Sequence, residues 1–256
     1  MTPRSGRRYH VEKCMGTVFS FDLEDILPPT ALDEALAWLH RMDAVFSPYR
    51  NDSDVSRLNR GEVAIIDCAP EVPSVLDLCQ DVAAETSGFF DAFATGVLDP
   101  CGVVKGWAIE QLHQRFLAAG SRRHCINGGG DIRCYAEQTD ATRTAGVPQW
   151  RLGISDPRHV RQMVALVEGT DLALATSGTA ERGRHILDPH TQQPPRGLLS
   201  ISLTGPDLTR VDAYATAAFA MSTAARDWIE GLPGIEAYGV VADGSTWQTS
   251  RFPTCA

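Results

Sequence analysis

Short apolar segments crowd the second half of this chain, whereas helical periodicity dominates the first half. The segments with the length and composition of strands are residues 150–155, 162–168, 171–175, 199–204 and 236–243, with two further stretches at 14–23 and 124–136. Apolar residues at helical spacing predict helices over 30–47, 73–87, 107–119 and 211–221, the first of them capped by Thr30. Because the strands come in a run after helices instead of alternating with them, we predict an α+β fold and not a doubly wound parallel sheet.

We expect one compact domain over residues 1–256, with a loose N-terminal segment at 1–13. The chain has 256 residues, and domains usually contain roughly 100–200 residues. Apolar residues make up 43% of the sequence, enough for a sizeable core. No internal repeat, low-complexity tract or Pro/Ser-rich linker divides the chain. The expected architecture is a mixed or antiparallel sheet with packed helices.

The net charge, the cysteines and the lack of long apolar stretches indicate which partners and which compartment to expect. The net charge of −9 argues against a nucleic-acid partner held by bulk electrostatics. The seven cysteines are odd in number and show no Cys-x-x-Cys spacing, which favours free thiols in a reducing compartment. No stretch reaches the roughly 18 apolar residues of a membrane span, and no apolar segment follows the basic N-terminus. We therefore expect a cytoplasmic protein without a membrane anchor.

The segment from Ala175 to Thr216 is the first candidate for chemistry. A Ser-Gly turn is expected at 177–178, and a charged loop then leads to the sequence His-Ile-Leu-Asp-Pro at 185–189. Asp212 and Thr216 are four residues apart, so on a helix they share one face. A carboxylate and a hydroxyl are hard oxygen donors that suit Mg2+ or Ca2+. Alternatively, Asp212 only caps the helix and Thr216 packs in the core.

A second candidate lies between Asp99 and Gly106. Gly102 and Gly106 allow a close approach of backbone to a neighbour or ligand. Lys105 is expected at a helix start, where the dipole favours anions, so it is either a phosphate contact or a solvated surface lysine. The glycines at 128–130 indicate a bulge or close packing within a strand region. They fit neither a P-loop nor a dinucleotide fingerprint, because no Gly-Lys-Ser/Thr and no helix follows.

A series of motifs in one order resembles the FAD:protein FMN transferases, the ApbE-type flavin transferases. The motifs are Met-Gly-Thr at 15–17, Phe-Ser-Pro-Tyr at 46–49 with 52–59, Ser-Gly-Phe-Phe-Asp at 87–91, 99–106, Ile-Asn-Gly-Gly-Gly-Asp-Ile at 126–132, 150–157, Ala-Thr-Ser-Gly at 175–178 with Glu181 and Arg182, 185–189, and Asp-Ala-Tyr-Ala-Thr at 212–216. Together they span residues 15 to about 222. The resemblance implies an ApbE-like fold related to the T-fold.

The resemblance also implies a site. FAD would lie in a cleft with Mg2+ at its diphosphate. The residues implied to line FAD are Met15, Tyr49, Phe89, Phe90, Asp91, Asp99, Lys105, His185 and Ile186. The implied metal ligands are the carbonyl of Gly102 and the side chains of Asp212 and Thr216. The implied catalytic residues are His185 as candidate base, Lys105 as a fixed positive charge, and Asp212.

The implied reaction moves FMN from FAD onto a Ser or Thr hydroxyl of a partner flavoprotein and releases AMP. The same site with water as nucleophile would make an FAD pyrophosphatase that gives FMN and AMP. A third alternative is a non-catalytic flavin-binding or storage module. For His185 the alternative is a structural hydrogen bond at the Asp188-Pro189 turn, and His190 is expected to lie outside the chemistry.

Overall fold

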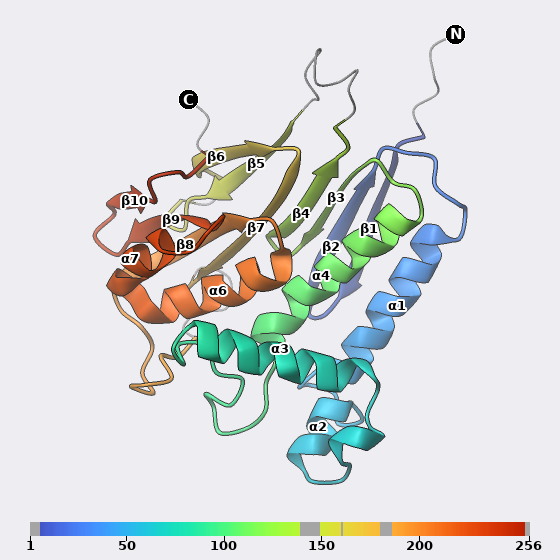
Figure 1. Ribbon diagram of the computed structural model, residues 1–256, viewed down its shortest axis with the longest axis horizontal. Coiled ribbons are helices and arrows are strands. Elements are labelled where there is room, and N and C mark those ends of the chain that lie inside the picture. Colours follow the sequence, from blue (N-terminus) through green and yellow to red (C-terminus); the bar gives the residue numbers. More distant parts are fainter. Residues whose placement is uncertain (1–5, 139–148, 160, 180–185, 254–256) are drawn as a thin grey trace.

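An eight-stranded antiparallel sheet is the frame of the molecule, and it joins strands from both ends of the chain (Figure 1). The computed structural model describes residues 6–138, 149–159, 161–179 and 186–253. The strands lie in the order β1-β2-β3-β4-β7-β8-β9-β10. Their bounds are Arg8–Cys14 (β1), Thr17–Leu23 (β2), Arg123–Gly128 (β3), Asp131–Ala136 (β4), Asp171–Gly178 (β7), Leu198–Gly205 (β8), Glu236–Val241 (β9) and Thr246–Gln248 (β10).

Tight hairpins explain where several of these strands begin and end. Met15 and Gly16 have φ of 51° and 69°, so the chain reverses between β1 and β2. The prediction of one strand over 14–23 is therefore wrong in its first residues. The prediction of a loose segment at 1–13 is also wrong for residues 8–13, because β1 pairs with β2 along its whole length. The turn predicted at 177–178 is wrong as well, since both residues pair with β8.

The alternation along β7 shows that both faces of the sheet are covered. Ala173 and Ala175 belong to the larger core, which the helices share, whereas Leu172 and Leu174 belong to a second apolar cluster. Successive side chains of a strand point to opposite faces, so the two clusters lie on opposite sides. The second cluster is completed by a two-stranded ribbon, β5 (Trp150–Ser155) and β6 (Met163–Gly169).

The helices pack against the other face of the sheet (Figure 1). Their bounds are Ala31–Phe46 (α1), Asp54–Asn59 (α2), Glu71–Glu85 (α3), Cys101–Ala118 (α4), Leu208–Met221 (α6) and Ala225–Glu230 (α7), with 3-10 turns at Ile65–Asp67 and Ser222–Ala224. The predicted helices are confirmed, but α4 begins at Cys101 and so includes Lys105. The predicted Thr30 cap is wrong, because its side chain makes no capping hydrogen bond.

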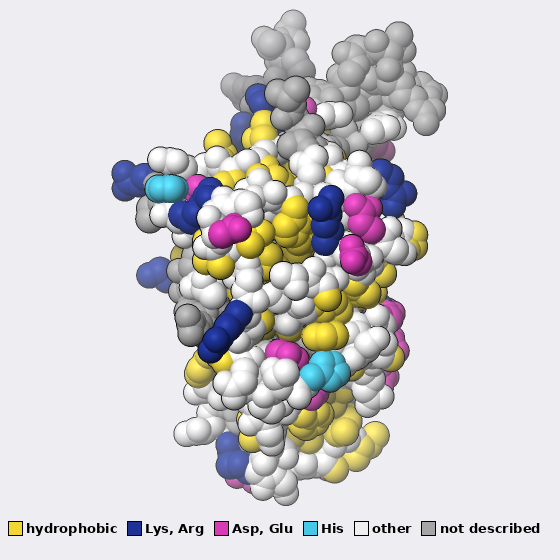
Figure 2. Space-filling model, turned by 90° about the vertical axis from the view of Figure 1, so that its left-hand side faces the viewer, with side chains coloured by type: hydrophobic (Ala, Val, Ile, Leu, Met, Phe, Trp, Pro, Cys, Tyr) yellow, Lys and Arg dark blue, Asp and Glu magenta, His cyan; other side chains and the backbone are white. Residues whose placement is uncertain are grey.

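The α+β prediction with an antiparallel sheet and packed helices is confirmed. Among the described residues, no helix combines the length and apolar character that a membrane crossing needs. Figure 2 shows Lys and Arg side chains interspersed with Asp and Glu on one face of the molecule. That face carries no concentration of positive charge.

Candidate active site

Helices α4 and α6 meet backbone to backbone at Gly106. A Cβ atom added to Gly106 would lie 2.6 Å from both the Cβ of Asp212 and the carbonyl oxygen of Leu208. The N–H of Gly106 donates a hydrogen bond to Oδ2 of Asp212 at 2.9 Å. In return, Oε2 of Glu110 accepts one from the N–H of Leu208 at 2.9 Å. Each helix thus offers a buried carboxylate to a backbone N–H of the other, which fixes Asp212 at the crossing.

Asp212 lies inside helix α6 and does not cap it. The N-cap is Asp207, whose side chain accepts a hydrogen bond from the N–H of Arg210 at 3.0 Å. Asp212 is 6% exposed. The alternative in which Asp212 serves only as a cap is therefore wrong. The sequence indicated the correct face of the helix but a start that is too late, because the helix begins at Leu208.

Lys105 extends from α4 toward two carboxylates. It forms an ion pair with Asp131, the first residue of β4, and its Nζ lies 3.5 Å from Oδ2 of Asp212. Asp131 is 1% exposed, and its Oδ1 accepts a hydrogen bond from the N–H of Thr176 at 3.2 Å. The lysine is therefore held at the site and is not a solvated surface residue. Asp131 belongs to the Gly-rich motif, but no separate role was predicted for it.

The predicted metal ligands come together near the crossing. Thr216 is one turn after Asp212 on α6, and its Oγ1 lies 3.5 Å from Oγ of Ser177. A Cβ atom on Gly102 would lie 3.7 Å from Cγ2 of Thr216. In a regular helix the N–H of Gly106 would donate to the carbonyl oxygen of Gly102. Here that N–H donates to the carboxylate of Asp212.

A carboxylate, a hydroxyl and a carbonyl oxygen form a hard donor set, which fits Mg2+ better than a soft metal. No group of three or more His, Cys, Asp and Glu side chains within the described ranges is arranged to hold a metal ion. The fit therefore depends on the mixed oxygen donors at the crossing.

Four of the residues implied to line FAD lie in the segment before α4, and three of them, Phe90, Asp91 and Asp99, make contacts with α4 or within the segment. Phe90 is buried, and its ring would be 2.9 Å from a Cβ on Gly102. Oδ1 of Asp91 accepts a hydrogen bond from the N–H of Phe93 at 2.8 Å. Oδ1 of Asp99 accepts one from the N–H of Cys101 at 3.0 Å, at the start of α4. Both aspartates thus shape the backbone of this segment in the structure.

The other residues implied to line FAD differ from one another in burial and in contacts. Met15 occupies the β1–β2 turn, and both Met15 and Ile186 pack partly buried against the larger core. Phe89 meets the ring of His190 edge to face, with centroids 4.6 Å apart. Tyr49 is 91% exposed, so the structure does not bring it into the cluster around Lys105. His185, together with Glu181 and Arg182 of the charged loop, lies outside the described residues.

Asn59 holds the segment before α4 from a distance in the sequence. Its Nδ2 donates to the carbonyl of Leu98, and its Oδ1 accepts from the N–H of Leu98, both at 2.8 Å. The side-chain amide of Asn59 thus satisfies both backbone groups of Leu98, as a neighbouring strand would. Sequence analysis quoted Asn59 within a motif but gave it no role. The only available signal was an Asn at the end of a short polar helix.

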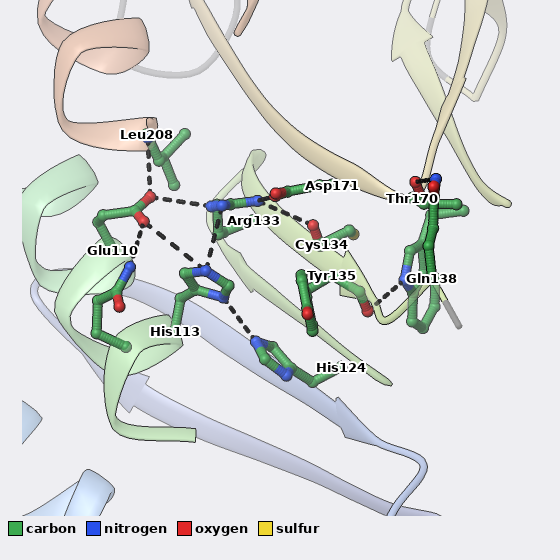
Figure 3. Close-up of polar contacts among 12 residues, drawn as sticks. Glu110, His113, His124, Arg133, Cys134, Tyr135, Gln138, Thr170, Asp171 and Leu208 are labelled. Carbon is green, nitrogen blue, oxygen red and sulfur yellow. Dashed lines mark hydrogen bonds and ion pairs between the residues drawn. The ribbon is translucent and has the colours of Figure 1, made fainter. Parts of the chain in front are cut away.

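Behind the crossing lies a buried polar network (Figure 3). Arg133 donates to Oε2 of Glu110 at 3.0 Å, to Oδ1 of Asp171 at 2.5 Å, and to Nε2 of His113 at 3.2 Å. Since a guanidinium can only donate, Nε2 of His113 accepts and its Nδ1 carries the proton. That Nδ1 lies 2.8 Å from Nε2 of His124. The network therefore favours neutral histidines.

The environment of these groups agrees with that assignment. Burial, with the nearby positive charge of Arg133, lowers the pKa of His113 to about 3. Burial, with the neighbouring His113 and Arg133, lowers the pKa of His124 to about 3. Burial also raises the pKa of Glu110, against the opposing effect of Arg133. Arg133 and His113 thus connect Glu110, and through it the start of α6, to the sheet.

The sequence model of the ApbE family matches residues 15–99 and 94–239, which is most of the chain. This chain belongs to the ApbE family. The ApbE match includes the segments of α4 and α6 that form the crossing, as well as the hairpin that carries Asp131.

Two relatives of this ApbE chain carry the name FAD:protein FMN transferase. The protein of Rhodobacter capsulatus is 31% identical over 163 residues, which is 59% of this chain and 29% of that protein. The protein of Vibrio cholerae serotype O1 is 28% identical over 134 residues, which is 48% of this chain and 38% of that protein. The chain thus matches less than half the length of either relative.

Solved ApbE structures share the fold. The ApbE protein of Thermotoga maritima has a TM-score of 0.83 at 22% identity and covers 95% of this chain and 97% of its own. The flavin transferase ApbE of Vibrio cholerae has a TM-score of 0.83 at 19% identity, covering 97% of this chain and 99% of its own. The predicted ApbE-like architecture is therefore confirmed.

Proposed function

We propose that this chain is an Mg2+-dependent transferase that moves FMN from FAD onto a Ser or Thr hydroxyl of a partner flavoprotein and releases AMP. The names of the two relatives support a flavin transfer to a protein. The observation that carries the proposal is the convergence of Asp212, Thr216 and Gly102 beside Lys105 at the crossing of α4 and α6.

Mg2+ would be held by the side chains of Asp212 and Thr216 and by the carbonyl of Gly102. Mg2+ prefers six oxygen ligands, so three protein oxygens leave positions for water and phosphate oxygens. When bound, the ion supplies Lewis-acid neutralisation of the charge on a diphosphate. The buried hydrogen bond from Gly106 orients the carboxylate of Asp212 before any ligand arrives.

Lys105 would add a fixed positive charge next to the diphosphate. Its ion pair with the buried Asp131 holds the ammonium group at the crossing, and its 3.5 Å separation from Asp212 keeps it close to the metal ligands. A charge fixed in this way costs little reorganisation during the reaction. Lys105 would therefore bind and orient the phosphates.

The transfer itself is a displacement at phosphorus. The acceptor hydroxyl oxygen forms a bond to the phosphorus of the FMN half, and the bond from that phosphorus to the bridging oxygen breaks. The electron pair of the broken bond leaves with AMP. The hydroxyl proton goes to a base, for which we propose His185 because a neutral imidazole is available near pH 7.

The flavin would lie along the segment before α4. Phe90 packs against the Gly102 turn of α4, and Asp91 and Asp99 shape the backbone beside it. We propose that Phe89 and Ile186 line the same cleft, with Met15 and the exposed Tyr49 at its edge. Because Tyr49 is exposed, we propose that its ring becomes covered when FAD binds.

Incubation with FAD and Mg2+, with and without the protein substrate of the Vibrio cholerae relative, tests the reaction. Release of AMP with flavin bound covalently to the acceptor supports transfer. AMP with free FMN in both samples would indicate hydrolysis by water. Tight FAD binding without AMP would indicate a flavin-storage module. Mg2+ omitted from a parallel sample is the control, and AMP release that persists there would contradict metal dependence.

A further inference from the structure

The β3–β4 hairpin places two cysteines opposite each other. Its turn consists of Gly129 and Gly130, whose φ values of 63° and 97° fit a two-residue type I′ turn. In such a hairpin the flanking residues, Gly128 and Asp131, form a hydrogen-bonded pair. Hydrogen-bonded and non-hydrogen-bonded pairs alternate along an antiparallel ladder. Counted back from the turn through the observed register, Cys125 and Cys134 are a non-hydrogen-bonded pair.

A non-hydrogen-bonded pair has the geometry that a disulfide needs. Its Cα atoms are about 4.5 Å apart and its side chains leave the same face of the sheet. Disulfides join Cα atoms about 4.4–6.8 Å apart. The register places the two thiols directly opposite each other, and burial, followed by the neighbouring Cys125 thiol, raises the pKa of Cys134. None of the six cysteines that the structure describes forms a disulfide.

The surroundings make the two thiols unequal. Cys134 is fully buried in the apolar cluster beneath the β5–β6 ribbon, with Leu152 and Val167 among its members. Cys125 packs against the same cluster but is partly exposed. A small oxidant therefore reaches Cys125 first. Cys134, directly opposite it, is placed to complete the bond.

We propose that Cys125 and Cys134 form a reversible cross-strand disulfide site, oxidised by exchange with a small disulfide such as oxidised glutathione. The thiolate of Cys125 attacks one sulfur of the reagent, and one glutathione leaves as a thiol. The sulfur of Cys134 then attacks Cys125 in the mixed disulfide and displaces the second glutathione. Two protein thiols are oxidised and one reagent disulfide is reduced. Each of the two departing glutathione molecules takes up one proton.

Trypsin makes the test direct. Cleavage after Arg123 and Arg133 separates the two cysteines into different peptides, so only a disulfide can keep these peptides together. The reduced protein is equilibrated in glutathione buffers of increasing oxidised fraction, alkylated, digested without reductant and measured by mass spectrometry. We expect the two peptides to appear as one linked species, lighter than the separate pair by two hydrogen atoms, and to separate again after reduction.

Two variants assign the order of events. In Cys134→Ala, Cys125 should keep one glutathione as a stable mixed disulfide. In Cys125→Ser, which changes the partly exposed member, Cys134 should remain a thiol in the most oxidising buffer. Circular dichroism checks that each variant is folded. Unlinked peptides from the wild-type protein in every buffer, or glutathione retained on its Cys125 without linkage, would overturn the proposal.

Discussion

The backbone N–H of Gly106 donates to the carboxylate of Asp212 across 2.9 Å, which joins α4 to α6 through a proposed ligand of the metal. One oxygen of that carboxylate therefore serves the fold. The helix–helix contact and the proposed site cannot be changed independently, unless a substitution keeps the hydrogen bond and removes the charge. Asp212→Asn is such a substitution.

Gly106→Ala should destabilise the protein by a net amount of about 1 kcal/mol, because overpacking a close contact typically costs about 1–3 kcal/mol before the gain in helix propensity is subtracted. The added Cβ would lie 2.6 Å from a backbone carbonyl of α6, which cannot rotate away as a side chain can. That cost exceeds the gain of about 1 kcal/mol in helix propensity. Urea unfolding measures the difference. Gly231→Ala is the control, since its nearest contact would be 3.4 Å. Equal effects at both positions would contradict a close crossing.

Glu110→Ala should lower stability by about 3–5 kcal/mol, the usual result of removing one partner of a buried ion pair. It would remove the buried carboxylate acceptor of the Arg133 guanidinium, which keeps Asp171, and the acceptor of the Leu208 N–H. Glu110→Gln keeps an oxygen for Leu208 and should lose clearly less. Denaturant unfolding of both variants tests this. Equal losses in the two variants would mean that the Leu208 hydrogen bond contributes nothing measurable.

The stability of the protein should fall as the pH falls from about 6.5 toward about 3. The pKa of His113 is about 3 in the fold and about 6.5 in an unfolded chain. Between these values the unfolded state binds more protons, so acid favours unfolding, and the contribution is complete above about pH 6.5.

His113→Gln should remove one titrating group from this window. The free energy of unfolding should then depend on pH less steeply, by up to about 1.4 kcal/mol per pH unit. The raised pKa of Glu110 acts in the opposite direction, so the comparison of variant with wild type isolates the histidine. Urea unfolding at a series of pH values measures the slope, and an unchanged slope would contradict a neutral buried His113.

Much of the fold could be predicted because period and length identify amphipathic helices and short strands. The boundaries that failed depend on information outside the local pattern. The β1–β2 turn has Met15 at positive φ, which composition does not reveal. Thr30 has the residue type of a cap but a helical backbone, and Asp207 has the capping role instead at α6.

Part of the proposed site could be predicted from spacing on one helix. That Asp212 and Thr216 share a helix face needed only the helical period, whereas Gly102 as a proposed ligand came from the resemblance alone. Asp131, Glu110 and Asn59 act through partners distant in the sequence, so no local pattern could assign their contacts. Lys105 lies between these cases. Its residue type and its place near a helix start predicted contact with an anion, but its ion pair with Asp131 is visible only in the structure.

Asp212→Asn tests the central claim most directly. Asparagine can still accept the hydrogen bond from Gly106, so the variant should fold, but it removes the one negative charge among the three proposed Mg2+ ligands. AMP release from FAD is measured over a range of Mg2+ concentrations, with Asp207→Asn as the control on the same helix. The account predicts that Asp212→Asn loses at least about 100-fold in Mg2+-dependent AMP release, comparable to removing one electrostatic catalytic group, while Asp207→Asn retains it. If folded Asp212→Asn released AMP at the wild-type rate and with the wild-type dependence on Mg2+, the account would be contradicted.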